Sequence, residues 1–287
     1  PRNGLSYEVR SLVVAGDELK PRDYVIEADD YGVPQSRHRV ILFGIRSDVA
    51  EATQALEAHP RWFLMKKSST KVNVNDALAG LPTLRSKLSK EPDSHEAWLT
   101  ALSDATRGLK TWRAPIRTRI EILMASSKKK ALAHASSGAA FTPMKTMKTG
   151  SMSQELRKWF IDPRLGGVLQ HESRSHMRSD LQRYLFASSF AKLTGYSPRL
   201  QAYPPRLLPA HGNVKPDEDA DVAENDGEGK TIPFSDRFRV QVGCEPSTTV
   251  VAHIKKDGHY YIHPDPSQCR SLTVREAASF ETFPDNY

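Results

Sequence analysis

The sequence predicts an α/β fold, from two apolar segments with strand composition and one long amphipathic helix. Residues 24–28 and 40–45 are short, rich in β-branched residues and bounded by charged or turn-forming residues. Residues 175–195 carry apolar side chains at helical spacing between a serine and a glycine. We therefore expect strands early in the chain and helices in its middle.

Strand signals dominate the first part of the chain. A mixed apolar segment runs from Tyr7 to Val14. Residues 40–45 (Val-Ile-Leu-Phe-Gly-Ile) contain no polar side chain, so we expect a strand that is buried on both faces of a sheet. Residues 47–59 follow as an expected helix, with Asp48 favourably placed at its start. Residues 72–78 are expected to form a short strand that leads into a short helix.

The middle of the chain is predicted to be largely helical. Residues 98–124 are interrupted near Gly108 and Pro115, which indicates two helices. Residues 126–150 are poor in large apolar side chains, which indicates a mobile loop or a surface shaped by a partner. The helix at 175–195 is expected to have Ser175 as its N-cap and to end at Gly195. Its two apolar stripes predict burial from two sides.

The last segment is predicted to form a hairpin followed by a helix. Residues 248–254 and 259–262 have strand composition on either side of an Asp-Gly pair, which favours a tight turn. Thr273 with Glu276 three residues later has the pattern of a capping box at the start of a helix. That helix is expected to end at the Phe-Pro-Asp triplet of residues 283–285.

Charge is distributed unevenly along the chain. The 287 residues have a formal net charge of +7, but residues 216–229 hold seven acidic residues and no basic one. The remainder has 41 basic against 27 acidic residues, which is a net charge of +14. Such a basic body is typical of proteins that bind nucleic acid, although solubility alone can produce the same sum.

Composition argues against several other classes. No run of about 18 apolar residues occurs, so no membrane-spanning segment is expected. The two cysteines, Cys244 and Cys269, lack metal-knuckle spacing and are too few for a disulfide framework, which favours a reducing, cytoplasmic setting. His171 and His176 are weak candidates for metal ligands, and we expect no metal site.

One polar pattern is suited to chemistry. Gln35, Arg37 and Arg39 form a Gln-x-Arg-x-Arg triplet that leads directly into the apolar run. In an extended chain these side chains lie on the same side, where two guanidinium groups can form a fork for a phosphate or a base carbonyl. The alternative is a surface arginine pair that flanks a strand and forms salt bridges.

Together with residues 270–287, this segment resembles the C5-cytosine DNA methyltransferase family. Residues 33–39 (VPQSRHR) resemble its eighth motif, and residues 270–287 resemble its ninth, with the Leu-Thr-x-Arg-Glu-Ala-Ala and Phe-Pro-Asp signatures. Residues 246–265 match the usual lead-in to the ninth motif, and residues 72–82 resemble the segment that often follows the eighth. Glu281, where the family commonly has Gln, is a departure from which we expect little effect.

Other elements of the family are missing from the sequence. The Phe-x-Gly-x-Gly turn of the methyl-donor site and the Pro-Cys pair of the nucleophile do not occur, and the one Glu-Asn pair, at residues 224–225, is out of family order. The resemblance therefore implies an incomplete, C-terminal piece of a longer enzyme. The nucleophile and most of the S-adenosylmethionine site would then lie outside it, and the chain would be inactive alone.

The resemblance implies the activity of a DNA (cytosine-5-)-methyltransferase. In this family the target cytosine is flipped out of the duplex, a thiolate adds to C6, and C5 takes a methyl group from S-adenosylmethionine. Arg39 is then expected to donate to O2 of the cytosine, where negative charge develops. Arg37 would support Arg39 or hold the adjacent phosphate, and Gln35 would orient the loop. A structural role is expected for Arg270, Thr273, Arg275 and Glu276.

The resemblance also divides the chain into three parts. Residues 1–85 would be the C-terminal part of a Rossmann-like S-adenosylmethionine-dependent methyltransferase sheet. Residues 86–245 would form a separate, mixed target-recognition domain with a disordered acidic loop at 213–230, and residues 246–287 would return to the catalytic domain. Phosphate contacts supply affinity in such domains, and the candidates, each of which is otherwise a solvated surface charge, are Lys128, Lys129, Lys130, Lys145, Lys148, Arg174, Arg178 and Arg183.

Double-stranded DNA is the expected partner, together with the missing N-terminal catalytic part or a cognate restriction endonuclease in a restriction-modification system. No membrane partner is expected. The alternative function is that of a non-catalytic DNA-binding subunit of a split methyltransferase, or of a decayed remnant.

Overall fold

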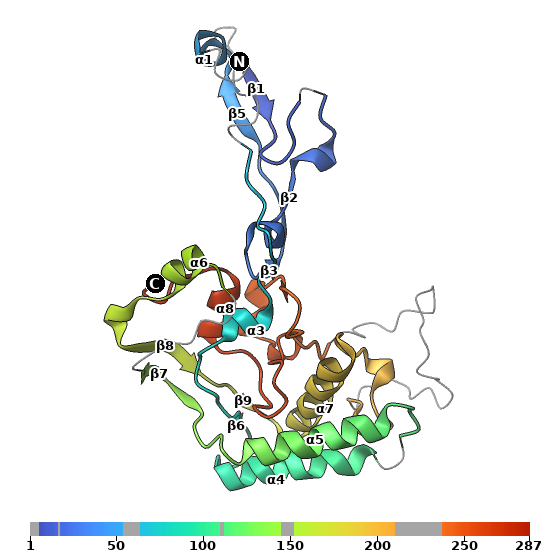
Figure 1. Ribbon diagram of the computed structural model, residues 1–287. Helices are drawn as coiled ribbons and strands as arrows, with labels where there is room; N and C mark the ends of the chain where they lie inside the picture. Colours follow the sequence, from blue (N-terminus) through green and yellow to red (C-terminus); the bar gives the residue numbers. More distant parts are fainter. Residues whose placement is uncertain (1–5, 17, 54–63, 110–111, 145–151, 210–236) are drawn as a thin grey trace.

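A long arm and a wider body make up the molecule (Figure 1). The computed structural model describes residues 6–16, 18–53, 64–109, 112–144, 152–209 and 237–287. The arm is formed by the first strands of the chain and by the helix at residues 47–53, and the body by the remaining helices and by two further strand pairs. The expected acidic loop at 213–230 lies outside the described residues. No helix in the described part of the chain is long and apolar enough to cross a membrane.

The strands are short and pair two by two, so that the described residues form five two-stranded sheets. The antiparallel pairs are β1 (Tyr7–Arg10) with β5 (Phe43–Arg46), β2 (Val25–Glu27) with β4 (His38–Val40), and β7 (Gly138–Pro143) with β8 (Gly167–Glu172). The parallel pairs are β3 (Gln35–Ser36) with β10 (Ser247–Thr248), and β6 (Lys87–Leu88) with β9 (Ser175–His176). The mixed α/β class is confirmed, whereas the larger Rossmann-like sheet remains a prediction.

Helices provide most of the body. Helix α1 (Ser47–Thr53) lies at the tip of the arm (Figure 1), and the others are α3 (Val74–Leu78), α4 (His95–Ala105), α5 (Arg117–Ala131), α6 (Gln154–Phe160), α7 (Arg178–Thr194) and α8 (Val274–Phe280). The break between α4 and α5 falls where the sequence predicts it. Helix α5 continues to Ala131 and β7 begins at Gly138, so part of the segment expected as a loop is regular structure. No strand precedes α3, because the Asn73 side chain caps that helix instead.

The largest apolar core lies among α4, α5 and α7. Helix α7 buries Tyr184 and Leu185 on one stripe and Phe186 and Phe190 on the other, as its two apolar stripes predict. Gly195 ends the helix in the left-handed conformation, with φ of 83°. The expected N-cap at Ser175 is wrong, because this residue belongs to β9, and its pairing with β6 holds the backbone extended up to His176.

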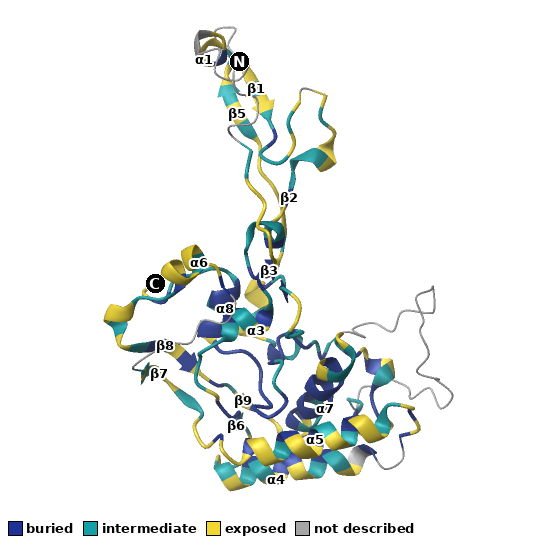
Figure 2. Cartoon of the chain, viewed as in Figure 1, coloured by how far each residue is buried: buried dark blue, intermediate teal, exposed yellow. Residues whose placement is uncertain are grey.

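The apolar run of the arm is exposed. Val40, Ile41 and Leu42 have exposed fractions of 61%, 48% and 61%, and the arm is among the most exposed parts of the molecule (Figure 2). The expectation of a strand buried on both faces is therefore wrong for the described chain. Strand β4 pairs with β2 in a two-stranded ribbon, and no further layer of the described residues covers it.

The hairpin expected between residues 248–254 and 259–262 does not form. Residues Ala252–Lys255 and Gly258–Tyr260 form 3-10 turns, and β10 is only two residues long. The expected hairpin is wrong because tertiary packing takes these apolar side chains. Val250 and Tyr261 join a second core with Val74, Leu272 and Phe280. This core lies where the arm meets the body, between α3 and α8 (Figure 1).

The exposure of the apolar run can be tested by truncation. In the 287-residue chain, Leu42→Ala should change the free energy of unfolding by less than about 0.5 kcal/mol, because it removes no buried contact. The matched variant Leu102→Ala, in the core on α4, should cost about 2–5 kcal/mol. Urea unfolding followed by circular dichroism measures both, and a comparable loss for the two variants would contradict the exposed position of Leu42.

Candidate functional site

The Gln-x-Arg-x-Arg segment is anchored at Gln35. Its side chain is 1% exposed, and strand β3 pairs in parallel with β10, so that Gln35 lies opposite Ser247. The Thr249 hydroxyl donates to the carbonyl of Ser36 at 2.9 Å and strengthens this connection. The segment is therefore fixed to residues more than two hundred positions later in the chain.

Arg37 lies between β3 and β4 and faces the end of α8. Its Nη1 group is 3.2 Å from Oε1 of Glu281 and 3.4 Å from Oε1 of Gln35. The side chains of Arg37 and Glu281 are each about one-third exposed. The structure thus brings Gln35 and Arg37 together, and it joins the eighth-motif segment to the ninth-motif helix through an ion pair.

Arg39 is placed differently from its two neighbours in the pattern. It belongs to β4, where it lies opposite Ile26, and its side chain is exposed. Its Nη1 group donates to the carbonyl of His38 at 2.7 Å. The strand assignment is interrupted at Arg37, and the strands on either side of it pair with different partners, β3 with β10 and β4 with β2.

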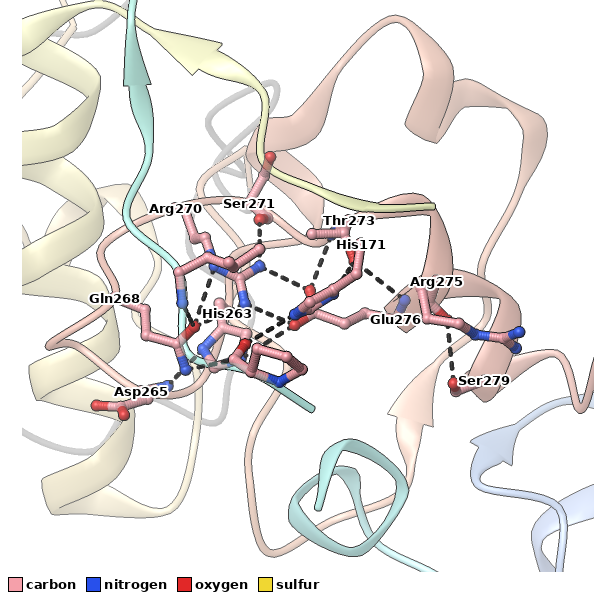
Figure 3. Close-up of polar contacts among 12 residues, drawn as sticks. His171, His263, Asp265, Gln268, Arg270, Ser271, Thr273, Arg275, Glu276 and Ser279 are labelled. Carbon is pink, nitrogen blue, oxygen red and sulfur yellow. Dashed lines mark hydrogen bonds and ion pairs between the residues drawn. The ribbon is translucent and has the colours of Figure 1, made fainter. Parts of the chain in front are cut away.

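A buried ion pair supports the start of α8 (Figure 3). Arg270 and Glu276 are each 1% exposed, and two hydrogen bonds of 2.6 and 2.7 Å join the guanidinium to the carboxylate. The remaining guanidinium donors reach Oε1 of Gln268 and the carbonyl of Ser271. All the charge in this interior cluster is therefore hydrogen-bonded, as a low-dielectric site requires.

The capping box expected at Thr273 and Glu276 forms around this pair. The Thr273 hydroxyl accepts from the backbone N–H of Glu276, and the Glu276 carboxylate accepts from the backbone N–H of Thr273. His171 of β8 lies beside it, with Nε2 2.7 Å from the carbonyl of Pro82 and Nδ1 3.0 Å from the Thr273 hydroxyl. Since a carbonyl can only accept, Nε2 carries the hydrogen and Nδ1 accepts.

The surroundings shift the pKa values of this cluster strongly. Burial alone would raise the pKa of Glu276, but the charge and hydrogen bonds of Arg270 hold it well below its usual range. Burial, reinforced by Arg270, lowers the pKa of His263 to about 4, and burial lowers the pKa of His176 on β9 to about 3. At neutral pH these histidines are uncharged parts of the interior.

Arg275 acts at the other end of the helix. Its guanidinium donates to the carbonyls of Phe283 and Pro284 and lies 3.5 Å from the Asp285 carboxylate. The Trp159 indole of α6 donates to the carbonyl of Thr282 at 2.7 Å. These contacts fold the segment after α8 back against α6 and the helix itself, and they hold Glu281 in place.

Some candidate phosphate contacts remain on the surface. Lys129 and Lys130 are exposed on the last turn of α5, and Lys128 is half-buried with its ammonium 3.5 Å from the Thr106 hydroxyl. Arg174 is half-buried and lies 3.5 Å from the carbonyl of Lys255. The other two lysine candidates, at positions 145 and 148, lie outside the described residues.

Two further candidates are engaged in structural contacts. Arg178 forms a bidentate ion pair with Glu91, at 2.8 and 3.3 Å. Arg183 donates to the carbonyls of Leu207 and Leu208, pairs with Asp180 at 3.0 Å, and is 13% exposed. Geometry therefore favours a supporting role for both arginines over a phosphate contact.

Two cavities are open to solvent. One of 240 Å³ is lined by Arg239, Thr248, Thr249, Val251, His253, Tyr260 and Tyr261, and one of 210 Å³ by Asn75, Leu78, Leu81, Pro82, Thr83, His263, Pro264, Asp265, Gln268 and Glu276. Neither contains a glycine-rich turn, and the two carboxylates of the second already accept hydrogen bonds from Ser267 and Arg270. The linings of these two cavities thus do not fit a methyl-donor cofactor.

The surroundings of Cys269 do not favour a nucleophile. The Cys269 thiol is buried and donates to the carbonyl of Leu181, and burial raises its pKa far above the usual range. Cys244 is exposed. Within the described residues, no group of three or more histidine, cysteine or acidic side chains could hold a metal ion.

Residues 33–39 pair with β10 through β3, and they contact residues 270–287 through the Arg37–Glu281 ion pair. These are the two segments that resemble motifs of DNA methyltransferases. The family model described as C-5 cytosine-specific DNA methylase matches residues 20–287. The chain belongs to this family.

Curated relatives carry type II methyltransferase names. The chain is 30% identical over 281 residues to the type II methyltransferase M.Bpa9945I of Bacillus paralicheniformis, a match that covers 98% of this chain and 47% of that protein. It is 22% identical to the putative type II methyltransferase M.OihORF3336P of Oceanobacillus iheyensis, over 92% of this chain and 54% of the relative. It is 23% identical to the type II methyltransferase M.AgeI of Thalassovita gelatinovora, over 91% of this chain and 57% of the relative. The chain thus spans about half the length of these relatives, and no solved structure matches it significantly.

Sequence reasoning missed several members of the interior cluster. His263, Gln268 and His171 complete the surroundings of Arg270 and Glu276, but they come from three places in the chain. His263 lies in the lead-in to the ninth motif and Gln268 just before that motif, and no periodicity or spacing marks them as buried. Glu281 stands out in the sequence only as a departure from the family, and nothing there indicates its contact with Arg37.

Acid should destabilise the protein before its carboxylates titrate. The folded-state pKa values of His263 and His176 lie below the ordinary value of 6.5. Below pH 6.5 these histidines are therefore protonated in the unfolded chain while they are still neutral in the folded chain. The stability from the neutral histidines is complete above pH 6.5 and falls as the pH drops toward about 4, by up to about 1.4 kcal/mol per pH unit for each.

Urea unfolding at pH 7.5, 6.5, 5.5 and 5.0 measures this slope. His176→Phe removes one titrating group, so this variant should have a shallower slope even if its stability at pH 7.5 is lower. Stability that stays constant between pH 6.5 and 5.0 would show that these histidines are accessible to protons in the folded chain.

Proposed function

We propose that this chain provides DNA recognition and target-base stabilisation in a type II DNA (cytosine-5-)-methyltransferase. One observation carries the proposal: the eighth-motif segment and the ninth-motif helix, 244 residues apart, meet at the Arg37–Glu281 ion pair. The eighth-motif segment also pairs through β3 with β10, which belongs to the lead-in to the ninth motif. Family membership and the names of the relatives support the reaction class.

Arg39 is proposed to donate to O2 of a flipped-out cytosine. When a nucleophile adds to C6, negative charge develops at O2 and N3 of the ring, and a fixed cation close to O2 lowers the barrier. The side chain of Arg39 is exposed and bonds within the chain to the carbonyl of its own neighbour His38. A guanidinium retains further donors after one such bond, so Arg39 can still bind a base.

The methyl group is proposed to come from S-adenosylmethionine. That cofactor supplies an electrophilic methyl group when it is bound, but no residue of this chain is assigned to it. The exposed apolar residues 40–42 are proposed to be covered in the intact enzyme by the remainder of a Rossmann-like sheet. The division into catalytic and recognition parts at residues 85 and 245 belongs to the same proposal.

DNA affinity is proposed to come partly from the end of α5. Lys129 and Lys130 are exposed there, and helix α5 supports them on one side of the body (Figure 1). Such contacts release counterions from the duplex and are independent of base sequence. A restriction endonuclease partner and a cytoplasmic restriction-modification role remain expectations that go with this function.

Arg39→Ala in the intact protein should reduce turnover far more than DNA binding. Loss of one preorganised donor to a developing oxyanion lowers kcat by a factor of about 10²–10³. Loss of one positive charge near the DNA backbone should weaken duplex binding by less than about tenfold. Transfer of a radiolabelled methyl group to cytosine-containing duplex measures turnover, and fluorescence anisotropy measures binding.

Arg46→Ala is the matched control, because this arginine lies on the same arm and forms a surface ion pair with Asp48. It should leave both quantities within about twofold. Equal losses of turnover and binding in Arg39→Ala would contradict the O2 role. DNA binding without any methyl transfer by the intact wild-type protein would favour a non-catalytic DNA-binding subunit instead.

The two types of basic candidate should respond differently to substitution. Lys129→Ala with Lys130→Ala should reduce the slope of log binding constant against log salt by about 2, with little change in stability. Arg183→Ala should instead lower the free energy of unfolding by about 2 kcal/mol or more, because it leaves Asp180 and two carbonyls without their donor. An unchanged salt slope in the double lysine variant would exclude α5 from the DNA interface.

A further inference from the structure

Arg37 is held within the chain through a single nitrogen of its guanidinium. Both of its contacts, with Glu281 and with Gln35, are made by Nη1. Within the described chain, Nε and Nη2 have no hydrogen-bond partner, and the side chain is one-third exposed. The Nε–Nη2 edge is one of the edges through which a guanidinium can bind a phosphate with two parallel hydrogen bonds. The ion pair therefore fixes the group and leaves its recognition edge open.

Glu281 is in an unfavourable position for its own helix. It is the C-cap of α8, and a negative charge at a helix C-terminus is repelled by the helix dipole. An exposed ion pair of this kind adds little to the stability of a fold. Helix stability thus gives no reason for a carboxylate at this place.

The turn after Glu281 is nevertheless constructed to hold it. Phe280 is fully buried, and the backbone N–H of Glu281 donates to the carbonyl of Ala277. Thr282 adopts a φ of 62°, a strained conformation for a β-branched residue, and its carbonyl accepts from Trp159. Surrounding contacts maintain this backbone strain at Thr282, which indicates that the position of the neighbouring Glu281 is important.

We propose that Glu281 is a positioning residue for DNA binding, which orients Arg37 so that its free edge meets a phosphodiester group of the duplex. The inference rests on the proposed function, since it takes the substrate to be double-stranded DNA. The carboxylate itself repels a phosphate, so its charge costs affinity while its hydrogen bond adds affinity through preorganisation. Two substitutions separate these opposite effects.

Glu281→Gln and Glu281→Ala both remove the negative charge, but only glutamine keeps an oxygen that can accept from Nη1. Glu281→Ala should therefore bind a mixed-sequence duplex about threefold more weakly than Glu281→Gln. Arg37→Gln should weaken binding about tenfold and reduce the salt slope by about 1. In the Arg37→Gln background the two Glu281 variants should bind equally, within about twofold.

Fluorescence anisotropy with a labelled 30-base-pair duplex at several salt concentrations measures all six proteins, and thermal unfolding of each verifies that it is folded. Equal binding by Glu281→Gln and Glu281→Ala, with Arg37 present, would overturn the positioning role. A difference between them that persists without Arg37 would overturn it too, because Glu281 would then act independently of Arg37. Failure of the wild-type chain to bind any duplex would refute both this inference and the proposed function.

Discussion

The buried pair of Arg270 and Glu276 is the interaction on which the rest of the site depends. Taking two charges out of water is costly, and removal of one partner leaves the other uncompensated, so the pair persists only because every donor and acceptor around it is used. Its hydrogen bonds fix the first turn of α8. They also connect that turn to Gln268, and through Thr273 to His171 of β8. Because the first turn of α8 is fixed, the position of its last turn, next to Glu281, is fixed as well.

The end of that helix is where the two halves of the chain meet. Glu281 follows α8 directly and contacts Arg37, while β10 pairs with β3 and the second apolar core fills the space between α3 and α8. The proposed stabilisation of a base would depend on the orientation of an arginine as well as on its charge. The C-terminal segment holds Gln35 and Arg37, the neighbours of Arg39 in the pattern, although it lies more than two hundred residues later in the chain.

Arginine residues divide into two groups by what surrounds them. Arg183, Arg270 and Arg275 donate hydrogen bonds to backbone carbonyls and buried carboxylates, and their charge is not available to a ligand. Arg37 and Arg39 keep donors that face solvent. The net positive charge of the chain therefore overstates the number of cations that can contact DNA, and only the contacts of each side chain distinguish the two groups.

Local patterns alone determined much of this protein. The capping box of α8, the break between α4 and α5, the two apolar stripes of α7 and the family motifs depend on residues close in sequence, and these were predicted. Tertiary structure alone decided the exposure of residues 40–42, the 3-10 turns in place of a hairpin, the interruption at Arg37 and its contact with Glu281. Burial and pairing depend on which distant surface a segment meets, and a linear pattern holds no information about that partner.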